Sequence, residues 1–151
     1  MKKLFFITMF LIAFVFANSQ TFKSEIESAI EEFEKGKRVM VSNFVDLPEN
    51  NVFWTIYDEF EKEREVFAKK QKEILLEYID NYSNYSEERL EVIMDKNIEN
   101  RNNIEKLRMR YFKKIKKECG SKVASQFWMV QRYFESTLNS RILGQLPILE
   151  N

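Results

Sequence analysis

The sequence contains no histidine and one cysteine, Cys119. Without histidine the chain lacks the commonest general base at neutral pH, so a Ser-His-Asp or Cys-His catalytic site is excluded. Zinc sites built from cysteine and histidine are excluded as well. A lone cysteine forms no disulfide within its chain, so packing alone must hold the fold together. We expect Cys119 to be a half-buried residue at a helix end, and an intermolecular disulfide is the alternative.

Glycine and proline are also scarce, with three glycines and two prolines. The glycines at 36, 120 and 144 stand far apart, so no glycine-rich phosphate-binding loop exists. The carboxylates follow charged helix faces, and the methionines are scattered as core-filling residues are. We therefore expect a non-enzymatic protein without a metal or another cofactor.

The N-terminus has the three parts of a secretory signal peptide. Met1-Lys2-Lys3 is followed by thirteen uncharged residues, 4–16, and then by small residues up to Ala17. Such a run is too short for a comfortable transmembrane helix, which needs about 20 residues. We expect residues 1–19 to be a signal peptide, cleaved after Ala17 or Ser19, and residues 20–151 to form one exported domain. An uncleaved membrane anchor is the alternative.

The charge of the chain is balanced, with 24 basic and 24 acidic residues. Loss of Lys2 and Lys3 with the signal would leave two fewer basic than acidic residues. Near-neutral charge and export both argue against a nucleic-acid partner. With no second long apolar segment, we expect no integral membrane segment after cleavage.

Hydrophobic periodicity predicts an all-α fold of four helices, at residues 22–44, 49–80, 87–118 and 122–143. Pro48 is expected in the first turn of the second helix, and Ser86 is expected to cap the third. Gly120 is expected to end the third helix. Because two of the helices are long, an elongated or cradle-like shape is favoured over a compact one.

The apolar residues of these helices follow a 4-3 spacing, which defines one buried seam per helix. Phe53 and Phe127 lie on seams and should be buried. Trp54 and Trp128 lie beside them, so each should be partly exposed or lie under a neighbouring helix. Gly36 occupies a skipped seam position and indicates either close approach of a partner helix or a break. Polar residues occupy further seam positions: Arg64, Gln71, Asn97 and Gln131.

The end of the third predicted helix is strongly basic. Basic residues suit a helix C-terminus, because the macrodipole is negative there. A site for acidic partners or anionic lipid is the alternative. The basic residues are Arg108, Arg110, Lys113, Lys114, Lys116 and Lys117.

Two helix starts resemble the Leu-Thr-x-x-Gln motif of the Spy/CpxP family of periplasmic helical proteins. The first contains Leu47 and Asn51, within Leu47-Pro48-Glu49-Asn50-Asn51, and the second contains Ser86 and Arg89, within Tyr85-Ser86-Glu87-Glu88-Arg89. An exported branch common in Bacteroidetes and proteobacteria is similar in the order of its aromatic motifs. The corresponding segments here are Phe53-Trp54-Thr55-Ile56-Tyr57, Asn81-Tyr82, Phe127-Trp128-Met129-Val130-Gln131 and the tail Leu146-Pro147-Ile148.

This resemblance implies a cradle-shaped antiparallel homodimer in the periplasm. It also implies ATP-independent binding of unfolded or misfolded envelope proteins, for which Trp54, Tyr57 and Trp128 are the candidate client-binding residues. The alternative function is an envelope-stress sensor, or a regulatory partner of a kinase or sigma-factor system. A structural coiled-coil spacer is disfavoured because the seams are interrupted.

Overall fold

The structure is a computed structural model of the 151-residue chain. It describes residues 2–81 and 85–144, with side chains for residues 23–80, 85–142 and 144. The described residues form three helices and no strand: α1 (Lys2–Val45), α2 (Val52–Asn81) and α3 (Glu87–Leu143). The all-α prediction is therefore confirmed. The side chains of the predicted signal peptide, Tyr82 and the tail Leu146–Ile148 lie outside the described residues.

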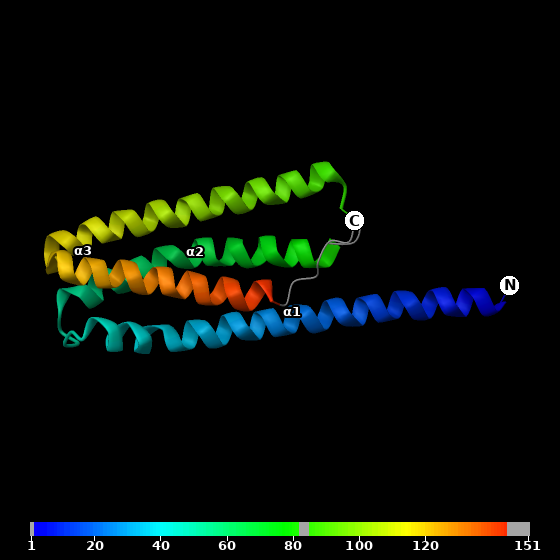
Figure 1. Ribbon diagram of the computed structural model, residues 1–151, viewed down its shortest axis with the longest axis horizontal. Helices are drawn as coiled ribbons and strands as arrows, with labels where there is room; N and C mark the ends of the chain where they lie inside the picture. Colours follow the sequence, from blue (N-terminus) through cyan, green and yellow to red (C-terminus); the bar gives the residue numbers. More distant parts are fainter. Residues whose placement is uncertain (1, 82–84, 145–151) are drawn as a thin grey trace.

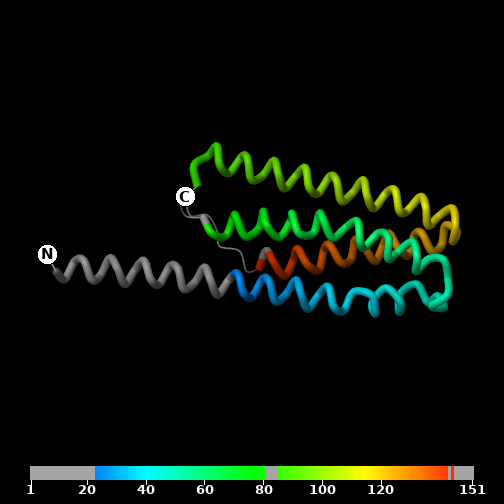
Figure 2. Tube along the Cα trace, turned by 180° about the vertical axis from the view of Figure 1, so that it is seen from behind, coloured from blue at the N-terminus to red at the C-terminus, as the bar shows by residue number. Residues whose placement is uncertain are grey.

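The helices lie side by side along the long axis of the molecule (Figures 1 and 2). α1 runs to one end of the bundle, and α2 returns from that end. α3 runs to the same end again and then folds back alongside α1 and α2. Contacts between distant residues agree with this course, since the Gln126 side chain donates to the Phe44 carbonyl oxygen at 3.0 Å. Tyr111 likewise donates to Glu63 at 2.6 Å.

The prediction of four helices was wrong by one, because the last two predicted helices form the single element α3. Helical hydrogen bonding resumes on both sides of Gly120, which alone has non-helical dihedral angles (φ 86°, ψ 167°). A side chain makes such angles costly, so glycine permits the reversal without linker residues. We call residues 87–119 the outward arm of α3 and residues 121–143 the return arm.

The connection between α1 and α2 corrects the predicted start of the second helix. Asp46 adopts a left-handed conformation, with φ 47°, and ends α1. Pro48 to Asn51 form a turn, closed by the Asn51 N–H donating to the Pro48 carbonyl at 2.9 Å. The Asn51 side chain then accepts from the Phe53 N–H at 2.9 Å, so Asn51 caps a helix that begins at residue 52, not 49.

The start of α3 matches the sequence prediction. Ser86 is its N-cap, and the Ser86 hydroxyl accepts from the Arg89 N–H at 3.3 Å. Glu87 and Glu88 occupy the first turn, where negative charge is favourable.

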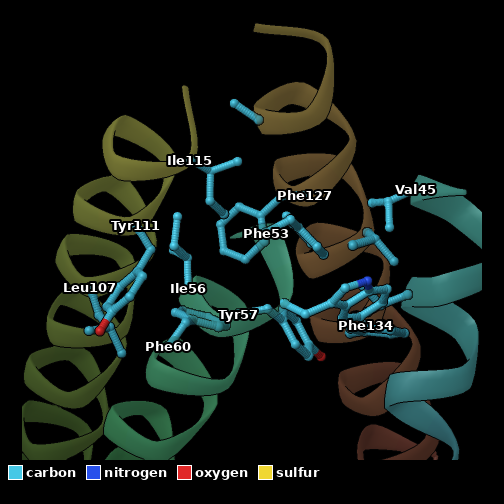
Figure 3. Close-up of a cluster of buried hydrophobic side chains, with 14 of the residues drawn as sticks. Val45, Phe53, Ile56, Tyr57, Phe60, Leu107, Tyr111, Ile115, Phe127 and Phe134 are labelled. Atoms are coloured by element: carbon cyan, nitrogen blue, oxygen red, sulfur yellow. The ribbon is translucent and has the colours of Figure 1, made fainter. Parts of the chain in front are cut away.

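The core is an aromatic cluster near the end of the bundle where α3 reverses (Figure 3). The Phe60 ring meets Phe127 edge to face at 5.1 Å and Tyr111 at 5.4 Å, which joins α2 to both arms of α3. Phe33 of α1 meets Phe134 at 5.4 Å. All the helices therefore share one core, and Phe53 and Phe127 are fully buried in it, as the seams predicted.

Gly36 neither breaks α1 nor faces a close neighbour. It lies within the continuous helix, and apart from its chain neighbours and the adjoining helix backbone no described atom is within 4 Å of the place a Cβ would occupy. The two interpretations drawn from the sequence are both wrong for the single chain.

We therefore expect Gly36→Ala to raise the free energy of unfolding by about 0.5–1 kcal/mol, because alanine is the better helix former. Urea unfolding followed by circular dichroism measures the change. A loss of stability would show that another chain covers this position.

Candidate functional site

Two of the three predicted client-binding residues lie in the core instead of on the surface. Trp54 is 4% exposed and Tyr57 is 2% exposed. The Trp54 indole N–H donates to the Pro48 carbonyl at 3.1 Å, and the Arg38 guanidinium lies 4.8 Å from its ring. Tyr57 points into the aromatic cluster (Figure 3). Neither side chain offers an exposed surface to a client in this conformation.

Trp128, the third predicted client-binding residue, is half-buried on the return arm. Its ring packs edge to face on Phe112 at 5.7 Å, and Arg108 lies 5.8 Å from its centre. Trp128 thus connects the two arms of α3 and does not join Trp54 in one site.

The predicted motif positions act at helix ends. Asn51 and Ser86 are caps, and Leu47 packs against the core. The Arg89 guanidinium pairs with Glu77 and so ties the start of α3 to α2. These residues position helices, and the structure does not bring them together.

The basic end of the outward arm is engaged in ion pairs with neighbouring segments. Arg110 pairs with Glu63 of α2, and Lys114 pairs with Glu59. Arg108 points inward and pairs with Glu105 and Glu135. Lys117 pairs with the adjacent Glu118 at 3.4 Å, so four of the six basic residues are engaged with carboxylates.

A buried ion cluster joins α1 to α2 beside the aromatic core. Lys37 is only 4% exposed, and its ammonium donates to Glu61 at 2.7 Å. Arg64 donates to Glu61 at 3.0 Å and to both oxygens of Glu34, at 2.6 and 2.8 Å. We call Glu34, Lys37, Glu61 and Arg64 the ion cluster.

Burial and mutual attraction set the protonation of this cluster. Burial lowers the pKa of Lys37 to about 8, with a contribution from the nearby Arg64 charge, against the attraction of Glu61. Burial opposes ionisation of Glu61, but Lys37 and Arg64 outweigh it and lower the pKa of Glu61. Burial and the Glu61 charge raise the pKa of Tyr57. The cluster therefore favours the ionised form of Glu61 and disfavours the charged form of Lys37.

A cavity of about 320 Å³ lies next to the ion cluster, between α1, α2 and both arms of α3. Where it borders the ion cluster, at its polar end, the lining includes Lys37, Arg64, Arg108 and Gln131. The lining also contains the polar Gln71, Lys72 and Asn97 and six apolar side chains: Ile30, Phe33, Leu75, Ile104, Leu138 and Ile142. Exposed Arg101 and Asn139 also line the cavity, so it reaches the surface between the arms of α3.

Two buried hydrogen-bond donors in this cavity have no acceptor. The Nε of Arg108 and the Nε2 of Gln131 make no hydrogen bond within the described part of the chain. Both residues are 4% exposed and both line the cavity. Buried polar groups are normally paired, so these two N–H groups need an acceptor from outside the chain.

A second surface feature is an exposed apolar strip where α1 meets the return arm. Phe44 lies opposite Gln126, as the hydrogen bond between them shows. One turn of α1 before Phe44 is Met40, and Met129 and Tyr133 follow Gln126 by one and two turns. Because the two segments are antiparallel, we infer that these residues follow the edge where α1 and the return arm meet. We call the four the α1–α3 strip: Met40, Phe44, Met129 and Tyr133, which are 40%, 48%, 61% and 58% exposed.

Within the residues whose side chains are described, no cluster of three or more possible ligands is arranged for a metal ion. The same part of the chain has no helix long and apolar enough to cross a bilayer. Comparison of the chain with family models, curated proteins and solved structures gave no match. The resemblance to Spy/CpxP proteins therefore rests on the sequence motifs alone.

The cavity was missed from the sequence, although its signal was present. Arg64, Gln71, Asn97 and Gln131 interrupt apolar seams, and all four line the cavity. Polar residues at seam positions mark a stretch where the helices enclose something other than a dry core.

Proposed function

We propose that the mature chain is a non-enzymatic, chaperone-like protein of the cell envelope that binds unfolded or misfolded polypeptides without ATP. The observation that carries the proposal is the α1–α3 strip. It combines two methionines with two aromatic residues, all exposed. Methionine adapts its shape to different partners and is favoured at promiscuous binding surfaces.

A charged residue neighbours the strip, which suits weak and reversible binding. Arg132 lies three residues after Met129 on the return arm, and its side chain is 55% exposed. Unfolded segments present apolar side chains between charged ones, so such a surface would hold many sequences weakly. Trp54 and Tyr57 have no place in this proposal, because they are buried.

The proposal includes the cradle-like homodimer that the family resemblance implies. Two copies would present two strips and bind a flexible client with higher avidity. Light scattering of the mature chain at micromolar concentration measures its mass, and a monomer mass would contradict this part alone.

The test is suppression of aggregation, without ATP, of two unrelated denatured clients such as citrate synthase and reduced lysozyme. We expect suppression by the purified mature chain. The double variant Met129→Gln/Tyr133→Gln should lose most of it, because it removes apolar surface one turn apart on the strip.

A matched control is available on the outward arm. Met94 and Ile98 are also one turn apart and exposed, at 51% and 52%, but lie off the strip. Met94→Gln/Ile98→Gln should leave suppression within error of the parent. The proposal fails if the parent does not suppress aggregation, and the strip is wrong if both double variants lose equal activity.

A further inference from the structure

The cavity between the helices has the size and composition of a small-molecule site. Its volume of about 320 Å³ lies at the lower end of the range for ligand pockets, about 300–1,000 Å³. All three helices build it, so it belongs to the folded bundle and not to one loop. The cavity is separate from the α1–α3 strip, so a ligand bound in it would be additional to the proposed chaperone activity.

The polar end of the cavity contains buried N–H groups that need a hydrogen-bond acceptor. Glu61 and Glu34 already hold Lys37 and Arg64, and Glu105 and Glu135 hold the terminal nitrogens of Arg108. Arg108 Nε and Gln131 Nε2 are left as buried donors without an acceptor among the described residues. Two buried acceptors, Glu61 Oε1 and Asn100 Oδ1, also lack a partner there, but neither residue lines the cavity. Two donors from adjacent segments suit an oxygen-bearing head group.

The two free donors suit an anionic head group. Five basic residues line the cavity, and each of them pairs with a carboxylate, so the walls carry no excess of positive charge. One of the free donors belongs to a guanidinium, and a carboxylate accepts stronger, charge-assisted hydrogen bonds from it than a neutral oxygen does.

The apolar part of the cavity lining suits an apolar chain. The cavity lining includes the apolar side chains of Ile30, Ile104, Leu138 and Ile142. Water alone would satisfy the two N–H groups, but it would leave the apolar walls of the cavity in contact with water. We propose that the cavity binds a medium-chain carboxylate of the fatty-acid class, with its head group at Arg108 and Gln131 and its chain between the apolar walls.

The experiment is calorimetric titration of the mature chain with decanoate, below its micelle concentration, and with decanol as the uncharged analogue. We expect one site per chain and an affinity for decanoate at least tenfold higher than for decanol, because only the carboxylate makes charge-assisted hydrogen bonds. The absence of binding heat with decanoate, or equal affinities for the two, would overturn the proposal.

Two variants locate the site. Gln131→Leu removes one donor, so decanoate affinity should fall about tenfold while decanol affinity stays within about twofold. Ala68→Leu adds three carbons to a wall residue of α2 and should abolish binding of both ligands. Val66→Leu, on the exposed side of α2, is the matched control and should bind like the parent.

Thermal melts establish that each variant is folded before titration. Gln131→Leu removes an unpaired buried polar group, so we expect it to melt no earlier than the parent. If Ala68→Leu is folded and binds decanoate like the parent, the ligand binds elsewhere and the proposal is wrong. Aggregation suppression is not a readout here, so this result stands apart from the chaperone test.

Discussion

Phe127→Ala is expected to lower the free energy of unfolding by about 3–5 kcal/mol, and Trp54→Ala by a similar amount. Phe127 is fully buried against Phe60 at 5.1 Å. Trp54 packs edge to face on Phe53 at 5.1 Å, and its truncation would also remove one of the two hydrogen bonds to the Pro48 carbonyl, the other coming from the Asn51 N–H. Urea unfolding followed by circular dichroism, extrapolated to water, measures both losses.

Trp128→Ala is the control, because it removes the same side chain from a half-buried site. Its ring contacts Phe112 and Arg108 but lies outside the aromatic core, so we expect a loss of about 1–2 kcal/mol. Equal losses for the two tryptophan variants would mean that Trp54 is more exposed in solution than in the structure.

The helices and their seams were predictable because they depend on local spacing. The seams identified Phe53 and Phe127 as buried, and Ser86 was recognised as a cap because its side chain acts on its own helix start. The exposure of residues beside a seam was not predictable from the sequence. Trp54 is buried because the connector supplies the Pro48 carbonyl and α1 supplies Arg38, and both contacts depend on the tertiary fold.

The predicted number of helices was wrong for a related reason. Gly120 was correctly identified as the point where the third predicted helix stops, but one residue at φ 86° lets the chain reverse without a loop. The sequence alone does not distinguish a turn of one residue from a short connector.

The ion cluster and the cavity show most clearly which features the sequence alone does not predict. Arg64 and Gln131 are far apart in the sequence, and each is visible as a polar residue on an apolar seam. That they line the same cavity depends on how α2 and the return arm are aligned, which local periodicity does not set. No sequence pattern indicated that Lys37 is buried. Its burial depends on its ion pair with Glu61, which the tertiary fold brings close.

The Lys37–Glu61 pair is therefore the place where one substitution should have a large and specific effect. We expect Glu61→Leu to lower the free energy of unfolding by about 3 kcal/mol at pH 7, because it leaves the buried Lys37 ammonium without its carboxylate. Lys37→Met should cost about 1 kcal/mol or less, since Glu61 keeps Arg64 as a partner. The double variant should recover most of the Glu61→Leu loss, as apolar replacements of whole buried pairs do.

The pH dependence tests the cause of that loss. The pKa of Lys37 is about 8 in the fold and 10.5 in the unfolded chain, so the unfolded chain binds more protons between these values. Parental stability should therefore rise as the pH increases above 8. Glu61→Leu removes an attraction that raises the pKa of Lys37, so its own gain should begin at a lower pH. Urea unfolding from about pH 7 to about pH 9 should show the difference between parent and Glu61→Leu shrinking, and a constant difference would mean that Lys37 charge is not the cause.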